Sequence, residues 1–432
     1  MTLLRTVFMV SFLYYFECTI FTMKVLLLWL TIAVASAMNI TRFDGEQVLR
    51  VIPQDEHQLQ QLTKLEATDF ELDFWKRPSG LFHPVDVRVP KDRLTYFKKL
   101  FGNTGMNHTV MIDDLQQLIN SQTSTSSVNG EFDFNKYNRI SAINAQLDKF
   151  ARTYPDRASV FTIGQSYEGR VIKGIKVGIP GYNKPAVVLE GTIHAREWIV
   201  AATLLYNIKF LLEGYDSDSK ITEVMNKVDF YFIPVTNPDG YEYTHTNNRM
   251  WRKTRSRTSW CIGVDPNRNF DDHFGGAGTS RNPCSDIYHG PHAFSEVETK
   301  AVSNWVLAKK AHIKAYLAVH SYSQLWMTPY GWTSKLPRDY SAQLGLARRA
   351  TQAIRRVYGT YFKSGSIANT IYAASGSSCD WAYEKAKIKY SYAIELRDKG
   401  WYGFILPANQ IKPSAKEFFA GLLVVAEQVA KE

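Results

Sequence analysis

The chain has few cysteines, no block of like charges and, near its amino terminus, no apolar run long enough to span a membrane. Only four of its 432 residues are cysteine, and like charges nowhere form a run of five. The basic residues are scattered, with their densest cluster at 249–257, although the formal net charge is +10. This distribution argues against a nucleic-acid-binding tail. Neither apolar run near the amino terminus reaches the roughly 18 to 20 residues of a membrane-spanning helix. We therefore expect neither nucleic acid nor a membrane as a partner.

The amino terminus has the pattern of a secretory signal peptide. Lys24 is followed by the apolar stretch VLLLWLTIAVASA, which ends in small residues at Ala37. Translation starts either at Met1 or at Met23, and we favour Met23. We set residues 1–37 aside as a signal region and expect the protein to be secreted.

Removal of the signal region leaves three cysteines in an oxidising compartment. One disulfide and one free thiol is then the simplest outcome. Cys261 and Cys284 lie closest together and flank a loop rich in Gly, Asn and Asp, so we pair them and leave Cys379 free. The sequence alone leaves the other two pairings open.

Residues 38–120 have the pattern of a small α+β domain. Alternating apolar residues predict strands at 47–53, 71–76, 85–89 and 108–112, and helices at 55–68 and 91–100. The order β-α-β-β-α-β is that of a ferredoxin-like domain. No metal or nucleophile cluster lies in it, so we interpret it as a folding or inhibitory module. Residues 121–131 are small and polar, which is typical of a linker.

From residue 132 onward, apolar runs alternate with amphipathic segments. The runs predict strands at 186–189, 230–235, 316–319 and 392–394, and the segments predict helices at 197–212, 295–308, 341–358 and 414–429. Ser295 and Glu298 suggest a capping box at the second helix. This alternation predicts one large α/β domain with a mostly parallel or mixed sheet.

Polar side chains follow each of the four predicted strands. In order these groups are His194 with Glu197, residues 236–239, residues 320–322 and residues 395–398. Ligands of open α/β sheets bind at the carboxyl ends of the strands, so we expect these groups to meet.

His194, Glu197 and His320 together form a candidate metal site. Two His and one Glu, with a fourth position left open, are a typical ligand set of hydrolytic zinc. The alternative for His320 is a core histidine bonded to a backbone carbonyl. Glu395 is either a general base beside the metal or an ion-pair partner of Arg397 or of another buried Arg. Arg252 and residues 265–269 either clamp an anion or form a solvated loop.

Seven motifs occur in order after residue 132: HAREW, NPDGY, WRKTRS, GVDPNRNF, HSYSQ, TIYAASGSSCDWAY and YAIELRDKGWYGFILP. Together they resemble the secreted zinc carboxypeptidases of the pancreatic A/B type. The resemblance implies a catalytic domain at 132–432, with a single large mixed sheet and helices on both faces. It also implies an inhibitory pro-domain at 38–120 and an activation cleavage within 121–131. The chain has no Lys or Arg between Lys99 and Lys136, so we expect a non-tryptic activating protease, or trypsin acting only at these two lysines.

The resemblance also implies roles for individual residues. One zinc ion per catalytic domain would be held by His194, Glu197 and His320, with Asp265 orienting His194. Glu395 would be the general base, and Arg252 would stabilise the oxyanion. The substrate's terminal carboxylate would be bound by Asn267, Arg268 and Tyr372. Neighbouring subsites would be lined by Arg196 and Tyr322.

The resemblance further implies that selectivity depends on the pocket for the last side chain, and alignment with the family places Cys379, Ala393 and Met327 in its lining. An uncharged Cys379 at its base and a small Ala393 predict a preference for aromatic and large aliphatic carboxy-terminal residues. An alignment shifted by one position would instead place Asp380 at the base and favour Lys and Arg.

The sequence therefore predicts a secreted zymogen that removes carboxy-terminal residues from peptides and proteins. An enzyme that releases Lys or Arg is the alternative with the same chemistry, and a catalytically silent peptide-binding protein of the same fold is the alternative of another class. Besides substrates with a free carboxylate, the expected partners are an activating protease and proteinaceous inhibitors. We expect a monomer in an extracellular setting such as the lumen of the digestive tract.

Overall fold

The computed structural model describes residues 40–123 and 132–432. Residues Arg42–Glu432 form one compact unit. The predicted signal region and residues 124–131 of the predicted linker lie outside the described residues. None of the described helices has the length and hydropathy to span a membrane. Below, residues 42–123 are called the amino-terminal segment and residues 132–432 the large domain.

The amino-terminal segment contains an antiparallel sheet of four strands in the order β2-β3-β1-β4. Its elements follow the predicted β-α-β-β-α-β order: β1 (Gln47–Val51), α2 (Glu56–Thr68), β2 (Asp73–Lys76), β3 (Val85–Val89), α3 (Leu94–Asn103) and β4 (His108–Ile112). The side chain of Asp55 caps α2 by accepting a hydrogen bond from the backbone N–H of Gln58. The ferredoxin-like prediction for this segment is confirmed by its strand order.

A helix that the sequence did not predict, α4 (Leu115–Thr123), ends the amino-terminal segment. It occupies the first three residues of the predicted linker. The side-chain amide of Gln122 forms two hydrogen bonds with the large domain. Its Nε2 donates to the carbonyl of Leu406, and its Oε1 accepts from Nε of Arg249. These contacts hold the polar sequence in a helix, so the linker prediction was wrong for 121–123.

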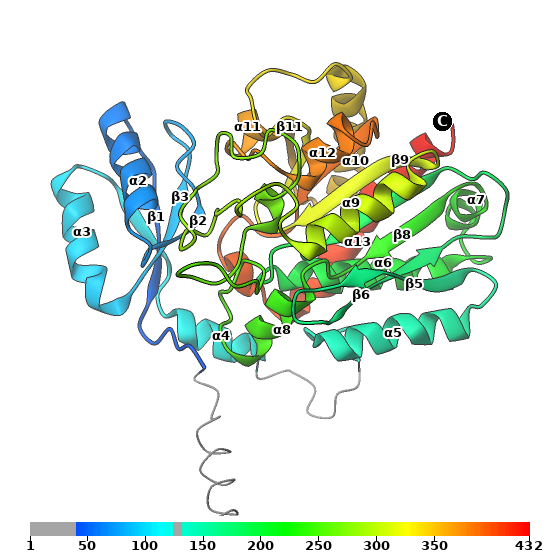
Figure 1. Ribbon diagram of the computed structural model, residues 1–432, viewed down its shortest axis with the longest axis horizontal. Coiled ribbons are helices and arrows are strands. Elements are labelled where there is room, and N and C mark those ends of the chain that lie inside the picture. The colour runs from blue at the N-terminus through cyan, green and yellow to red at the C-terminus, as the bar shows by residue number, and fades with distance from the viewer. Residues whose placement is uncertain (1–39, 124–131) are drawn as a thin grey trace, which may run out of the picture. The chain divides into compact units, whose positions relative to one another are not determined.

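The large domain contains a mixed sheet of eight strands in the order β11-β10-β12-β9-β7-β8-β6-β5 (Figure 1). The strands are β5 (Ala158–Gln165), β6 (Val171–Val177), β7 (Ala186–Gly191), β8 (Asp229–Ile233), β9 (Ile313–His320), β10 (Leu325–Thr328), β11 (Lys363–Ser366) and β12 (Tyr390–Glu395). The four strands β12, β9, β7 and β8 run parallel to one another. They are the four strands that the sequence predicted.

Helices cover both faces of this sheet. The helices are α5 (Ile140–Thr153), α6 (Trp198–Gly214), α7 (Ser219–Lys227), α8 (Pro238–Thr246), α9 (Val297–Lys309), α10 (Tyr340–Tyr358), α11 (Ile367–Thr370), α12 (Ser378–Glu384) and α13 (Ile411–Val429). One core cluster joins residues of α5, α6, α10 and α13 to one sheet face, and a second joins α9 and α12 to the other. The prediction of an α/β domain with helices on both faces is confirmed.

The capping box predicted at α9 is not formed. The helix begins at Val297, and Ser295 Oγ instead donates to the Glu296 carboxylate. The Glu298 carboxylate is buried and accepts the backbone N–H of Tyr167, 2.9 Å away. A long-range partner in the loop after β5 has therefore replaced the local one.

Glu298 leads to a prediction about stability and pH. Burial raises the pKa of this carboxyl to about 7, from an ordinary value of 4.5. The raised pKa contributes stability that is complete below pH 4.5 and is lost as the pH rises through 7. We expect Glu298→Gln to raise the thermal denaturation midpoint at pH 8.5 and to leave it nearly unchanged at pH 5. The gain at the higher pH is on the order of 3 kcal/mol, and equal midpoints at both pH values would contradict this account.

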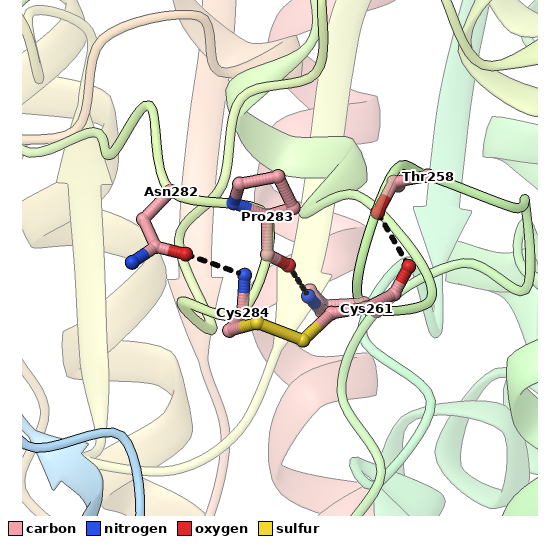
Figure 2. The surroundings of a disulfide bond; sticks show 6 residues. Thr258, Cys261, Asn282, Pro283 and Cys284 are labelled. Carbon is pink, nitrogen blue, oxygen red and sulfur yellow. Dashed lines mark hydrogen bonds between the residues drawn. A yellow bond between two sulfur atoms is a disulfide. The ribbon is translucent and has the colours of Figure 1, made fainter.

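Cys261 and Cys284 form a disulfide, as predicted, and Cys379 is free and buried. Figure 2 shows that the bridge joins two loops of irregular structure. Asn282 accepts the backbone N–H of Cys284, and the Thr258 hydroxyl donates to the carbonyl of Cys261. The bridge thus fixes loops that lie outside the regular sheet and helices.

Candidate active site

Three parallel strands deliver the predicted catalytic side chains to one end of the large sheet. Glu395 at the end of β12 pairs with His320 at the end of β9. Gly191 at the end of β7 pairs with Val319 on the other side of β9, and the turn after β7 carries His194 and Glu197. The predicted convergence at the carboxyl ends is therefore formed by three of the four groups.

The fourth group has a different role. Asp239, which follows β8, accepts hydrogen bonds from the hydroxyl of Ser166 and the backbone N–H of Glu168 and forms an ion pair with Arg170. Asn237 caps α8 and donates to the carbonyl of Ile193. The expectation that residues 236–239 join the site was wrong, because local caps and the loop after β5 satisfy the polar side chains of Asn237 and Asp239.

His194, Glu197 and His320 face one another in the interior of the protein. The Nδ1 atoms of the two histidines lie 3.2 Å apart. Glu197 Oε1 is 2.7 Å from His194 Nδ1, and Glu197 Oε2 is 3.2 Å from His320 Nδ1. In the described part of the chain, this is the only group of three or more His, Cys, Asp or Glu side chains whose ligand atoms could surround one metal ion.

The donor set fits a divalent cation such as zinc. Burial and the nearby Arg252 lower the pKa of His194, which favours the neutral imidazole that a metal binds. His194 Nε2 lies 3.1 Å from Asp265 Oδ1. The carboxylate therefore accepts the N–H of Nε2, and the lone pair of Nδ1 is left for a metal ion. Against the effect of burial, the two histidines keep the pKa of Glu197 well below its ordinary value. Against the effect of burial, Glu197 and Glu395 raise the pKa of His320, so metal binding would displace a proton from this imidazole. The cluster then offers two nitrogen lone pairs and one anionic carboxylate, as zinc prefers.

Arg252 and Asp265 form a buried ion pair beside this cluster. Arg252 Nη2 donates to Asp265 Oδ2 at 2.9 Å. Burial opposes ionisation, but Arg252 and His194 hold the pKa of Asp265 well below its ordinary range. The pair places one fixed cation next to the candidate metal site.

The carboxylate oxygen Oε2 of Glu395 is shielded and has no hydrogen-bond partner among the described residues. Burial, together with the charge of Glu197, raises the pKa of Glu395 to about 8, against the opposing charge of His320. The alternative that Glu395 pairs with Arg397 does not hold, because Arg397 is bonded to Glu417. Glu395 therefore has an oxygen that no described protein group occupies and that a bound molecule can contact by a hydrogen bond.

Asn267, Arg268 and Tyr372 lie on the same side of the site. Arg268 is 1% exposed, and its Nε donates to the carbonyl of Gly278. Its Nη2 atom is buried and has no hydrogen-bond partner within residues 40–123 and 132–432. Asn267 Nδ2 lies 3.4 Å from His320 Nε2. Burial raises the pKa of the Tyr372 hydroxyl, and the positive charges of Arg252 and Arg268 act in the opposite direction. A buried guanidinium nitrogen without an acceptor is suited to bind an anion.

Met327, Cys379 and Ala393 belong to one apolar cluster on the α12 side of the sheet. Asp380 has a separate role, because its two carboxylate oxygens accept the backbone N–H groups of Tyr330 and Gly331 at 3.0 and 2.7 Å. Both carboxylate oxygens of Asp380, the residue that the shifted alignment would place at the base of the pocket, therefore already accept hydrogen bonds.

Two carboxylates of the amino-terminal segment accept hydrogen bonds from Arg196 and Tyr322, the two residues predicted to line subsites. Asp73 in β2 accepts two hydrogen bonds from Arg196 Nη1, at 2.8 and 2.9 Å. Asp86 in β3 accepts the hydroxyl of Tyr322 at 2.7 Å. A cavity of about 170 Å³, lined by both sides of this contact, includes Asp73, Arg196 and Arg252. The segment thus covers the side of the site on which Arg196 lies.

A third contact reaches the Arg268 side of the site. Arg77, directly after β2, donates to the carbonyl of Gly278 that also accepts Arg268 Nε. Its guanidinium lies 5.9 Å from the ring centre of Tyr372. The sequence did not reveal Asp73, Arg77 or Asp86 as site residues, because their partners are 100 or more positions away and no motif marks them.

Phe404 is a further residue that sequence reasoning missed. Its ring lies 4.2 Å from the guanidinium of Arg196 and 5.0 Å from the ring of Trp75 in β2. A single aromatic residue near a turn carries no distinguishing signal.

Comparisons with known proteins agree with this geometry. Residues 143–421 match the family model described as zinc carboxypeptidase, and residues 49–122 match that of the carboxypeptidase activation peptide. Carboxypeptidase A2 of Mus musculus is 44% identical over 398 residues, covering 90% of this chain and 94% of that protein.

Two solved structures show the same fold. Thrombin activatable fibrinolysis inhibitor (TAFI) matches with a TM-score of 0.84 at 32% identity, covering 90% of this chain and 100% of that one. Bovine thrombin-activatable fibrinolysis inhibitor in complex with tick carboxypeptidase inhibitor matches with a TM-score of 0.66 at 37% identity, covering 69% and 99%. The chain therefore belongs to the zinc carboxypeptidase family, as a zinc-dependent metallocarboxypeptidase that carries an activation peptide and is made as a zymogen.

Proposed function

We propose that this protein is a secreted exopeptidase that hydrolyses the last peptide bond of peptides and proteins and prefers aromatic or large aliphatic carboxy-terminal residues. The observation that carries the proposal is the unpartnered Nη2 of buried Arg268 on the same site as the His-Glu-His cluster. An anion clamp held at a fixed distance from the metal confines cleavage to the chain end.

The proposed roles follow from the contacts of each side chain. His194, Glu197 and His320 would hold one zinc ion, which when bound lowers the pKa of water and polarises a carbonyl. Glu395 would accept a proton from water on Oε2 and pass it to the leaving amine. Arg252 would donate hydrogen bonds to the oxyanion, while Asp265 keeps it in place. The terminal carboxylate would be bound by Asn267, Arg268 and Tyr372.

The apolar character of the cluster around Cys379 supports the proposed preference. Bonds from two backbone N–H groups already occupy the Asp380 carboxylate, so this residue is unsuited to receive a Lys or Arg side chain. The A-type name of the murine relative agrees with this selectivity. Arg196 and Tyr322 would line upstream subsites once the activation peptide has left.

Replacing Cys379 tests the assignment of the pocket base. We expect Cys379→Lys to move the preference toward acidic carboxy-terminal residues, raising the ratio of kcat/KM for Glu over Phe by about tenfold or more. The control is Asp380→Asn, which should lower stability and leave the preference unchanged. An unchanged Glu-to-Phe ratio in Cys379→Lys would remove Cys379 from the pocket base.

Secretion and partners belong to the same proposal. The signal-peptide pattern and the disulfide between Cys261 and Cys284 support secretion. The complex of the bovine relative with a tick inhibitor supports binding of proteinaceous inhibitors at the open site. An activating protease would cleave near residues 121–131, and sequencing the amino terminus of the processed form would locate the cut.

A peptide panel tests the function directly. Peptides ending in Phe, Leu, Lys or Arg are incubated with the processed protein, with and without a metal chelator, and the products are read by mass spectrometry. We expect single-residue trimming of Phe and Leu peptides that stops with chelator and resumes with zinc. Fastest release of Lys and Arg would establish the basic-specific alternative, and bound zinc without trimming of any peptide would establish a silent binding protein.

A further inference from the structure

Glu190 is a buried acidic residue that the proposed reaction does not use. It lies in β7, four positions before His194, and is 1% exposed. Glu190 Oε2 accepts hydrogen bonds from the hydroxyls of Tyr316 and Ser378, each at 2.6 Å. Oε1 is buried and has no hydrogen-bond partner among the described residues. A carboxylate held this far from water requires a reason beyond filling space, because its desolvation is costly.

Ser378 connects Glu190 to the proposed carboxylate clamp. It is the first residue of α12, and its backbone N–H donates to Asn267 Oδ1 at 2.9 Å. The backbone N–H of Asn267 in turn donates to Asp265 Oδ1 at 2.9 Å. Because Oδ1 of Asn267 is used as an acceptor by Ser378, its amide NH₂ faces the other way, toward His320. The orientation of this amide therefore depends on where the first turn of α12 lies.

We propose that Glu190 and Ser378 are positioning residues for recognition of the substrate's terminal carboxylate. The Glu190 carboxylate holds the Ser378 hydroxyl and thereby ties the first turn of α12 to β7, the strand that leads to His194 and Glu197. The Ser378 N–H then fixes the orientation of the Asn267 amide. The NH₂ group of this amide, on the side of His320, would donate to the bound carboxylate. The tie sets the distance between the metal ligands and the clamp, and it also holds Cys379, the next residue of α12. This inference rests on the proposed carboxylate clamp.

Tyr316 supplies a matched control. Its hydroxyl bonds to the same oxygen of Glu190, but Tyr316 lies in β9 and not in α12. A role that depends only on satisfying the buried carboxylate predicts similar effects of Ser378→Ala and Tyr316→Phe. A role in positioning the clamp predicts an effect of Ser378→Ala alone.

The test measures binding of a product amino acid and of its amino alcohol, which lacks the carboxylate. The ligand is the amino acid that the wild-type enzyme releases fastest, and affinities are measured by calorimetry on the processed, zinc-loaded enzyme. We expect Ser378→Ala to lower the ratio of acid to alcohol affinity by about fivefold. The same variant should raise KM with a smaller change in kcat. Glu190→Gln keeps an acceptor oxygen and should lose less, and Tyr316→Phe should keep the wild-type ratio.

Two results would overturn the inference: an unchanged affinity ratio in Ser378→Ala, or an equal loss in Tyr316→Phe. Thermal denaturation of each variant separates these results from general unfolding. The wild-type enzyme tests the underlying clamp separately, because a ratio near one in the unmodified protein would reject the clamp itself.

Discussion

Replacing Glu395 by Gln is expected to reduce kcat of the processed enzyme by about 10³-fold, within the range typical for loss of a general base, while one zinc per chain is retained. Gln has nearly the same shape as Glu but cannot accept a proton. The residue pairs with His320 across β12 and β9, and its Oε2 atom has no bond to lose within the described protein. The substitution therefore removes the proposed proton acceptor and leaves the candidate metal ligands in place.

The measurement combines single-turnover kinetics on a peptide ending in Phe with metal analysis of the same sample. Glu298→Gln is the matched control, because it neutralises another buried carboxylate whose contacts are all outside the site. This control should keep wild-type kcat and zinc content. Full activity of Glu395→Gln would assign the base to another residue, and loss of zinc would make Glu395 part of the metal site.

The parts of the structure that sequence could predict depend on local patterns and one general rule of sheets. Apolar runs at 186–189 and 316–319 predicted β7 and β9 because fully buried parallel strands need continuous apolar residues. The carboxyl ends of parallel strands meet at one edge, so His194 and His320 were expected together although 126 positions separate them. Their roles in catalysis remain predictions.

Sequence failed where tertiary contacts outweighed local preference. Gln122 lies in a segment with the composition of a linker, yet its bonds to Leu406 and Arg249 keep α4 helical. Ser295 and Glu298 have the spacing of a capping box, but Tyr167 takes the Glu298 carboxylate. In each case the conformation depends on a hydrogen-bond partner that is far away in the sequence. Rules based on local residue preference and spacing do not take such a partner into account.

The basic cluster at 249–257 also shows why charge alone is a weak guide. Arg249 lies over the ring of Trp198 at 3.7 Å and donates to the carbonyls of Arg196 and Phe404. Arg252 is paired with Asp265, and Arg255 lies 3.6 Å from the ring centre of Tyr243. These three cations have partners within the protein, and Arg249 and Arg252 contact residues of the candidate site.

Replacing Asp73 by Asn is expected to give the unprocessed zymogen measurable activity on small peptides. In the zymogen, Asp73 accepts both of its Arg196 bonds from one buried nitrogen, and Arg88 adds a charge at 3.5 Å. Against the effect of burial, the charges of Arg196 and Arg88 lower the pKa of Asp73, so the carboxylate is ionised at neutral pH. Removing one partner of a buried ion pair typically costs about 3–5 kcal/mol. The activation peptide should therefore open over Arg196 about 10² to 5 × 10³ times more often, and peptide hydrolysis by the intact zymogen should rise accordingly.

Three comparisons make this expectation specific. Asp44→Asn removes another carboxylate of the amino-terminal segment, but its ion pair with Arg42 is largely exposed, so zymogen activity should stay at the wild-type level. After processing and removal of the activation peptide, Asp73→Asn and wild type should have the same kcat and KM, because the large domains are identical. Arg196→Gln should also raise the activity of the intact zymogen. It should, however, weaken substrate binding after processing, since Arg196 is a proposed subsite residue. If Asp73→Asn leaves the intact zymogen silent, inhibition must depend on the contacts of Asp86 with Tyr322 and of Arg77 near Tyr372. Burial of Asp73 against Arg196 would then be a contribution to docking rather than the contact that keeps the site closed.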